Sequence, residues 1–513
     1  MFLYLIIFVC TAIVLYFKWC YSYWQNRGFP YVKAKTPYGA LDSVIRTWKQ
    51  SVGIAMYDIY AATPQHKMVG IYLLNRPALM VRDAHLARNI LTRDFNSFHD
   101  RGIYVDEIHD PMSGGLYFLK GQQWKSMRSK LAPSFTSGKL RGMFGLIDEV
   151  SHRMVDYMKT TLPEDGTYKT VEAKHVFVTY GIDIIASSIF GLDVNSFKDN
   201  QNEFFALSKN VNENSYRGKL RITCQYMYPS LEKFFQRLGW REPAPEYMKK
   251  LVRRTIEHRD KHNIVRKDML QLLLQLRNTG KINDDNDLEW AAKKTKDDLA
   301  AISMELIAAQ LFIFYVAGFE TSSATIAFTL YELSQYPELL QKAQEDVKQA
   351  YEKHGSLSYD AITDMKFLDL CFMETARKYP GLPVLNRECT EDYTIPDTDL
   401  VIKKGTPIII SLFGIHRDEK YFPNALGYDP ERYLNKNYEE AAFMPFGEGP
   451  RHCIAQRMGR LIVKVALAHV LTNFNIKINE NPVEIEFDNF GIPIMPKGGV
   501  PLLLSRKTET MKI

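Results

Sequence analysis

One stretch constrains the fold of this chain more than any other, and it reads Phe446-Gly447-Glu448-Gly449-Pro450-Arg451-His452-Cys453-Ile454-Ala455. A single cysteine follows a loop with two glycines and a proline, and an apolar helical pattern begins directly after it. A thiolate at the start of a helix is stabilised by the helix dipole and by free backbone N–H groups. The glycines let the backbone approach a large, flat ligand, and Arg451 could form an ion pair with an anionic group of that ligand. Two interpretations are open: a thiolate ligand to a haem iron, or a buried structural cysteine.

Composition narrows the class of protein. The six cysteines are scattered without any CxxC pair, which argues against a disulfide framework and a structural zinc site and favours a reducing compartment for the body of the protein. The net charge of +6 over 513 residues is modest and does not indicate a nucleic-acid partner.

The N-terminus predicts a membrane anchor. Residues 2–17 carry no charge, and apolar character continues past Lys18 to Trp24, close to the roughly 20 residues that span a bilayer. A cleaved signal peptide is the competing interpretation, but no basic residue precedes the apolar run and no clear small-residue cleavage site follows it. Because the basic residues come after the run, the large domain is expected in the cytosol.

The rest of the chain predicts a mainly α fold with a smaller β-rich part. Residues 26–40 contain Gly28, Pro30, Pro37 and Gly39 and few helix formers, which indicates a linker, so we expect an anchor over 1–25, this linker, and one domain over 41–513. Two apolar runs, 69–74 and 78–81, predict a hairpin. A helical pattern extends from Gln122 for about 250 residues, a polar interruption covers 277–297, and short β-like runs fill 474–504.

A second informative stretch runs from Leu306 to Thr321. It is almost wholly apolar between Glu305 and Glu320, which is too short to span a membrane and fits a helix buried in a core. It ends in Ala317-Gly318-Phe319-Glu320-Thr321, where the glycine leaves room for a ligand and the acid–alcohol pair could deliver protons. The alternative is a helix that turns polar where it reaches solvent.

Two further pairs are weaker signals. Glu374 and Arg377 share one helix face after an apolar run, which suggests a buried ion pair with Arg432 as a further partner. Trp124 and Arg128 also share a helix face and both can donate to a carboxylate. An exposed pair and a packed Trp beside a solvated Arg are the plainer interpretations.

Taken together, and in their order along the chain from Trp124/Arg128 through 317–321 and Glu374/Arg377 to 446–453, the four motifs resemble the cytochrome P450 superfamily of haem-thiolate monooxygenases. The resemblance covers essentially the whole chain, including the anchor. Four short stretches of sequence resemble more closely the insect microsomal family six. They are Phe98-His99-Asp100-Arg101-Gly102, Arg266-Lys267-Asp268-Met269, Leu385-Asn386-Arg387-Glu388-Cys389-Thr390 and Phe443-Met444-Pro445-Phe446-Gly447. Three departures are Ala455 where glycine is usual, Tyr433 where phenylalanine is usual, and a linker with few prolines.

The resemblance implies a role for each matching residue. Cys453 would be the axial ligand of the iron, with Phe446 packed near its sulfur. The haem propionates would accept hydrogen bonds from Trp124, Arg101, Arg128, Arg387 and Arg451. Ala317 and Gly318 would lie along the haem face. Glu320 and Thr321 would deliver protons during O–O cleavage. Glu374, Arg377 and Arg432 would form a structural network around the haem-binding core.

The resemblance also implies partners and place. The cofactor is haem (iron-protoporphyrin IX), with one oxygen atom from O2 inserted into a small lipophilic substrate. Electrons would come from NADPH through NADPH–cytochrome P450 reductase, with cytochrome b5 as a further candidate, and Arg451, Arg457 and Arg460 could form a docking face for an acidic partner. The protein would sit in the endoplasmic reticulum membrane with its domain in the cytosol. It would metabolise xenobiotics, such as insecticides and plant toxins, or endogenous hormones.

Two other functions stay open at this stage: a haem-thiolate isomerase or dehydratase that needs no oxygen, and a non-enzymatic haem-binding sensor. The acid–alcohol pair favours the oxygen-activating enzyme. By the same resemblance, substrate contacts are expected from five separate segments, 103–119, 205–235, 312–321, 382–384 and 490–492.

Overall fold

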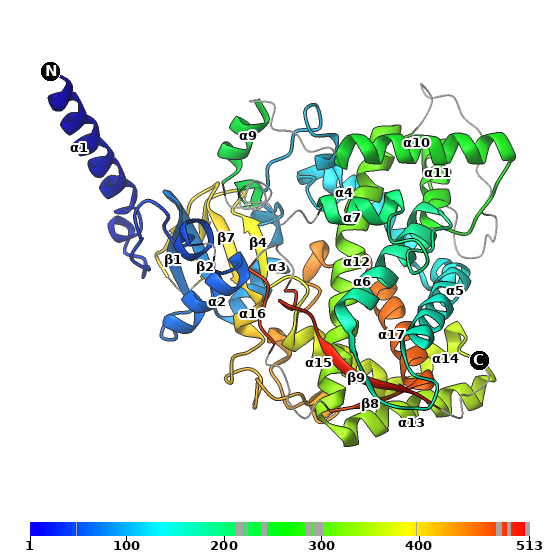
Figure 1. Cartoon of the computed structure of the whole chain (residues 1–513). Helices are drawn as coiled ribbons and strands as arrows, with labels where there is room; N and C mark the ends of the chain where they lie inside the picture. Colours follow the sequence, from blue (N-terminus) through cyan, green and yellow to red (C-terminus); the bar gives the residue numbers. More distant parts are fainter. Residues whose placement is uncertain are drawn as a thin grey trace.

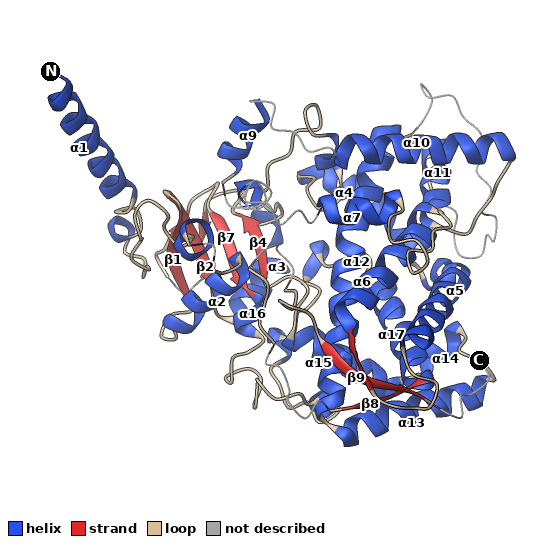
Figure 2. Ribbon diagram, viewed as in Figure 1, coloured by secondary structure: helices blue, strands red, loops and turns tan. Residues whose placement is uncertain are grey.

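The computed structural model describes residues 1–47, 49–211, 220, 224–226, 228–237, 244–282, 290, 301–396, 398–478, 485–489 and 494–507. Figure 1 shows a large helical part, a smaller part built around a sheet, and helix α1 (Phe2–Cys20) projecting from the sheet side. The predicted mainly α fold with a smaller β-rich part is confirmed (Figure 2). The predicted tip at 490–492 and most of the polar interruption at 277–297 lie outside the described residues.

The helical part accounts for most of the chain between residues 121 and 378, as its apolar periodicity predicts. Its helices are α4 (Gly121–Leu131), α5 (Ser137–Thr161), α6 (Ala173–Ile185), α7 (Glu203–Val211), α10 (Ala244–His262), α11 (Met269–Thr279), α12 (Met304–Gln335), α13 (Pro337–His354), α14 (Tyr359–Asp364) and α15 (Lys366–Lys378), joined by α17 (Gln456–Asn473). The described residues also form helices α2 (Val52–Ala62), α3 (Ala84–Leu91), α9 (Pro229–Arg237) and α16 (Leu412–Ile415).

The main sheet has the strand order β1-β2-β7-β4. Its strands are β1 (Met68–Leu73), β2 (Arg76–Val81), β7 (Pro407–Ser411) and β4 (Val384–Glu388). Strands β1 and β2 form the predicted antiparallel hairpin, β2 pairs parallel with β7, and β7 pairs antiparallel with β4. Two small sheets join β3 (Lys169–Glu172), β9 (Pro501–Arg506) and β8 (Phe474–Lys477), and β5 (Tyr393–Thr394) with β6 (Val401–Ile402).

Helix α12 runs through the helical part and organises it. The Ser303 hydroxyl caps its first turn by accepting a hydrogen bond from the Leu306 backbone N–H at 3.1 Å. The helix packs against α6, α10, α15 and α17, and most of its side chains are buried. One stripe is not: within 312–321 the partly or fully accessible positions are Phe312, Ile313, Val316, Ala317, Gly318, Glu320 and Thr321. The core helix therefore keeps one accessible face near its middle.

The cysteine loop lies between two hydrophobic cores. One core is formed by the helices, and the other by the main sheet with α2 and α3. Ala442 and Met444 belong to the sheet-side core, whereas Phe446, Ile454 and Ala455 pack against the helical core. The loop around Cys453 is thus fixed from both sides.

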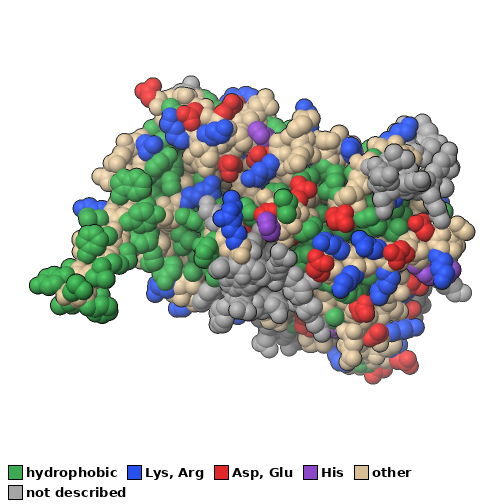
Figure 3. Space-filling model, turned by 90° about the horizontal axis from the view of Figure 1, so that it is seen from above, with side chains coloured by type: hydrophobic (Ala, Val, Ile, Leu, Met, Phe, Trp, Pro, Cys, Tyr) green, Lys and Arg blue, Asp and Glu red, His purple; other side chains and the backbone are tan. Residues whose placement is uncertain are grey.

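Two described helices are long and apolar enough to cross a membrane. Over half of the apolar window in Met304–Gln335 is buried, so α12 is a core helix, as predicted. The window in Phe2–Arg27 is not buried at all, and Figure 3 shows hydrophobic side chains covering the projecting N-terminal segment. That helix is a candidate anchor, because its apolar surface has no protein to cover it.

Candidate functional site

The Cys453 loop is shaped by two glycines with positive φ. Gly447 has φ +71° and Gly449 has φ +69°, a region that side chains with a Cβ disfavour. A Cβ on Gly449 would overlap the backbone carbonyl oxygen of Leu91. The close approach at this glycine is therefore to the end of α3. The Cys453 N–H donates to the Phe446 carbonyl at 2.9 Å and closes the loop.

The Cys453 thiol is accessible and yet surrounded by protein. Its side chain is exposed, while burial raises the pKa of the thiol. The Ala455 backbone N–H, Arg128 and Arg101 act in the opposite direction and lower that pKa. A thiol that is reachable, desolvated and faced by cations is suited to bind a metal as a thiolate, because coordination deprotonates it outright.

Four guanidinium groups cluster beside this loop, from Arg101, Arg128, Arg387 and Arg451. Burial, followed by the charges of Arg101 and Arg451, holds the pKa of Arg387 well below its usual range. Burial and Arg101 likewise lower the pKa of Arg451 to about 9, with Asp100 the opposing anion. The cluster carries a surplus of positive charge in a buried place.

Backbone groups satisfy only part of this cluster. Arg451 donates to the carbonyls of His99 at 2.6 Å and Leu119 at 2.7 Å, and Arg387 donates to the Asn386 carbonyl at 2.9 Å. Among the described residues, Arg101 Nε and Nη1, Arg387 Nε and Arg451 Nη1 are buried without a hydrogen-bond partner. Buried donors of this kind are rare and costly. Their number and charge fit the two carboxylates of a haem, so the residues present suit that cofactor.

Trp124 and Arg128 occupy two different positions relative to the loop. The Trp124 ring is buried and carries the Arg451 guanidinium 4.2 Å from its centroid. Arg128 donates from Nη1 to the His452 carbonyl at 2.7 Å, next to Cys453. Phe446 stacks on Phe372 of α15 with ring centroids 5.9 Å apart. All these predicted residues therefore lie around one loop.

The predicted residues of α12 differ in what they face. Ala317 is exposed although it lies in the middle of a core helix, and Glu320 and Thr321 are partly accessible on the same stripe. The Thr321 hydroxyl donates to the Ala317 carbonyl at 2.7 Å. A Cβ on Gly318 would come within 2.6 Å of Ile185 Cδ1, so close packing of α6 already accounts for this glycine.

Glu374 is the centre of a fully buried ion network, as the sequence suggested. It accepts hydrogen bonds from Arg377 at 2.8 and 2.9 Å and from Arg432 at 3.1 Å, and none of the three side chains is exposed. The Tyr433 hydroxyl donates to the same carboxylate at 3.1 Å. The departure from phenylalanine at this position thus adds a donor that no local pattern reveals.

His416 is a buried residue that the sequence did not single out. Its Nδ1–H donates to the Arg377 carbonyl at 3.1 Å, and its Nε2 accepts from the Met444 N–H at 3.2 Å. The ring therefore joins the Glu374 network to the chain leading into the cysteine loop. Burial and the charge of Arg377 lower the pKa of His416 from 6.5 to about 3.

We expect His416 to make stability depend on acidity. The folded state disfavours the protonated ring, so the unfolded state binds more protons and stability falls as the pH drops below about 6.5 towards 3. Between pH 7 and pH 5 the loss is about 2 kcal/mol from this group. Urea unfolding at both pH values measures it, and His416→Gln is expected to lower stability but to remove this part of the pH dependence. An equal loss in both proteins would contradict the assignment.

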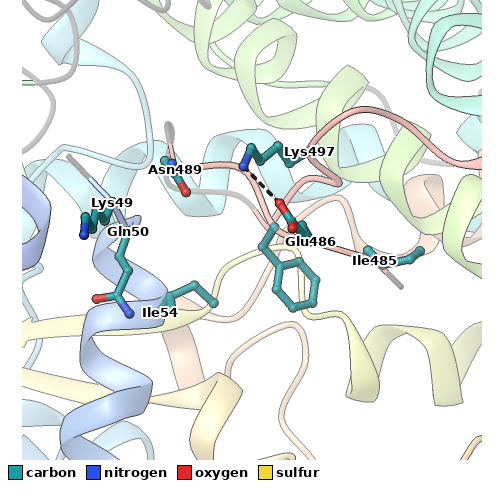
Figure 4. A pocket seen from close by; sticks show the side chains of 8 residues that line it. Lys49, Gln50, Ile54, Ile485, Glu486, Asn489 and Lys497 are labelled. Atoms are coloured by element: carbon teal, nitrogen blue, oxygen red, sulfur yellow. Dashed lines mark hydrogen bonds and ion pairs between the residues drawn. The ribbon is translucent and has the colours of Figure 1, made fainter. Parts of the chain in front are cut away.

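The pocket shown in Figure 4 is separate from these residues. It has a volume of about 460 Å³ and lies between the start of α2 and the segment before β9. Its lining residues are Lys49, Gln50, Ile54, Ile485, Glu486, Phe487, Asn489 and Lys497, with Lys497 paired to Glu486 at 2.9 Å. None of the predicted site residues lines it.

Sequence comparisons agree with this geometry. A family model described as Cytochrome P450 matches residues 50–502. The chain is 55% identical to the Drosophila melanogaster protein named "Probable cytochrome P450 6d5", over 98% of this chain and 99% of that one. It is 48% identical to "Cytochrome P450 6d3" of Musca domestica, over 99% of both chains, and 49% identical to "Cytochrome P450 6d1" of the same species, over 97% and 98%. The similarity extends over nearly the full length of each protein.

Proposed function

Because the chain belongs to the cytochrome P450 family of haem monooxygenases, we propose that it inserts one oxygen atom from O2 into small lipophilic molecules with electrons taken from NADPH by a reductase. The predicted family, enzyme class and haem cofactor are confirmed by the family match and by the named relatives. The observation that supports the rest is one arrangement: a reachable thiol, a cationic cluster in which four buried donors lack a hydrogen-bond partner among the described residues, and an accessible stripe on α12 that ends in an acid and an alcohol.

We assign Cys453 as the ligand of the haem iron. Arg101, Arg387 and Arg451 hold the propionates through the donors that lack a partner among the described residues, and Arg128 adds charge beside His452. When bound, a haem with a thiolate ligand supplies the oxygen chemistry, which the protein positions and protects. Glu320 and Thr321 move protons at the Glu320 carboxyl and the Thr321 Oγ1. Ala317, on the same stripe, leaves space for substrate.

The substrate side of the stripe is apolar. Phe312, Ile313 and Val316 share the accessible face with Ala317. The loop before α4 lies against this helix, since Gln310 Nε2 donates to the Gly114 carbonyl and Gln310 Oε1 accepts from the Leu116 N–H, both at 2.9 Å. An apolar face closed by a loop favours lipophilic molecules. A role in the metabolism of xenobiotics, such as insecticides and plant toxins, or of hormones is consistent with that preference.

We propose that α1 anchors the protein in the endoplasmic reticulum membrane, with the haem domain in the cytosol. The helix is apolar and unburied, and basic residues follow it. The division into an anchor (1–25), a linker (26–40) and a haem domain (41–513) is part of this proposal. NADPH–cytochrome P450 reductase is the proposed donor and cytochrome b5 a further one. Arg451 is 3% exposed and cannot form part of their docking face, which corrects the sequence-based expectation.

Turnover tests the proposal directly. The full chain, loaded with haem in detergent or lipid, is incubated with a panel of lipophilic compounds, NADPH and added reductase. We expect oxygenated products that require both NADPH and reductase. A protein that binds haem but forms no product under any of these conditions would be a sensor, and a product formed without O2 would indicate an isomerase or dehydratase.

Replacing Thr321 with alanine tests the proton-delivery role. In the unchanged protein the Thr321 hydroxyl donates to the Ala317 carbonyl, and the variant lacks this hydroxyl. We expect the amount of product per NADPH consumed to fall about tenfold or more, and the amount of hydrogen peroxide to rise. Thr325→Ala is a matched control, because its hydroxyl makes the same kind of bond one turn later, to the Thr321 carbonyl at 2.8 Å. Unchanged coupling in Thr321→Ala, or an equal loss in Thr325→Ala, would rule out the proposed role.

A further inference from the structure

Three potential metal ligands meet between α5 and α17, away from the cysteine loop. Asp148 and His152 lie one turn apart on α5, and His469 lies near the end of α17. His469 Nε2 is 2.9 Å from Asp148 Oδ1, and His152 Nε2 is 3.6 Å from Asp148 Oδ2. The two imidazole rings are edge to face, with centroids 4.8 Å apart. One carboxylate therefore faces two histidines, and the ligand atoms of all three residues lie within 4.8 Å of one another.

His469 is the fully buried member of this cluster. Its side chain is completely buried, and its Nδ1 has no partner among the described residues. His416, the other fully buried histidine discussed above, has both ring nitrogens paired. Within the described part of the chain, the His469 ring makes its side-chain hydrogen bond to Asp148, so Nε2 is directed into the cluster. Nε2, which is 2.9 Å from Asp148 Oδ1, is the nitrogen that the ring offers to the cluster, whereas Nδ1 points away from Asp148 and takes no part in the site.

We propose that Asp148, His152 and His469 form a binding site for a divalent transition metal of the zinc class. Two imidazoles and one carboxylate are a ligand set that Zn²⁺ accepts, with water completing the coordination. Mg²⁺ and Ca²⁺ prefer oxygen ligands only and are poorly matched by two ring nitrogens. The single negative charge of the carboxylate offsets part of the charge on the metal.

The site can be reached from solvent and can close on a metal. The Asp148 side chain is 28% exposed and that of His152 is 45% exposed, so two ligands lie at the rim while His469 forms the buried wall. The half-exposed His152 can rotate to shorten its distance to the others. A bound metal would fasten α5 to the last part of α17, the helix that begins three residues after Cys453. Metal binding should therefore stabilise the folded protein.

Zinc titration of the haem-loaded full chain, prepared without a polyhistidine tag, tests the proposal. We expect one Zn²⁺ per chain by calorimetry or chelator competition, and a thermal midpoint that rises by about 2–5 °C at saturation. Asp148→Asn and His152→Ala alter only the rim of the site and should stay folded. Each is expected to weaken Zn²⁺ binding at least about tenfold and to remove the thermal shift.

A control separates this site from adventitious binding to surface histidines. His258 and His262 lie one turn apart on α10 with ring centroids 4.3 Å apart and are exposed. His258→Ala should leave the Zn²⁺ stoichiometry and affinity unchanged. The proposal is overturned if the wild-type chain binds no stoichiometric Zn²⁺, if Asp148→Asn binds it as tightly as wild type, or if His258→Ala removes the binding.

Discussion

Replacing Cys453 with alanine is expected to abolish the red-shifted absorption band of the reduced carbon monoxide complex and to reduce product formation to background. The thiolate is the proposed ligand through which the protein sets the electronic properties of the haem iron, and alanine has no group to take its place. The measurement is a difference spectrum of the reduced, haem-loaded protein with and without carbon monoxide.

The loss should be chemical and not a failure to fold. The Cys453 side chain is exposed, so its truncation leaves no packed cavity, and its backbone N–H still donates to the Phe446 carbonyl. We expect the unfolding free energy of the cofactor-free variant to change by less than about 1 kcal/mol. Cys10→Ala is the matched control, since Cys10 is also exposed but lies on α1. A retained band in Cys453→Ala would mean that another residue binds the iron.

The parts of the site that could be predicted from sequence are the ones that are local in the chain. Glu374 and Arg377 are three residues apart, Trp124 and Arg128 are four apart, and the glycines of the cysteine loop are adjacent to it. Periodicity also identified α12 as a buried helix and the β1–β2 hairpin. In each case one or two turns of regular structure are enough to bring the groups together.

The parts that could not be predicted depend on distant contacts. The tight packing at Gly318 needs Ile185 on another helix, and that at Gly449 needs the end of α3. Asp148 and His469 are 321 residues apart in the chain. In the sequence His416 is an isolated histidine, because its two backbone partners, at Arg377 and Met444, are distant in the chain. Arg451 looked like a surface cation because burial is decided by tertiary packing, not by residue type.

Replacing Glu374 with alanine is expected to cost roughly 3–5 kcal/mol of folding stability and to prevent stable haem loading. The carboxylate is the common acceptor for Arg377, Arg432 and Tyr433, and it also accepts from the Asp429 N–H at 3.0 Å. Its loss leaves two fully buried guanidinium groups without this counter-charge. The free energy of unfolding of a single domain is only about 5–15 kcal/mol, so the expected loss is a large part of it. Urea unfolding followed by circular dichroism, with haem content measured in parallel, gives the comparison.

Two further variants show whether the stability lost in Glu374→Ala comes from the burial of the charged groups or from charge pairing as such. Tyr433→Phe removes one donor to Glu374 and leaves both arginines paired, so we expect a smaller loss of about 1–3 kcal/mol. Asp360→Asn breaks an ion pair with Arg141 whose contacts, at 2.6 and 2.7 Å, are as short as those of Glu374, but both side chains are more than half exposed. It should cost less than about 1 kcal/mol, because water solvates the separated charges. If Asp360→Asn and Glu374→Ala were equally destabilising, desolvation would not be the reason that the Glu374 network stabilises the fold.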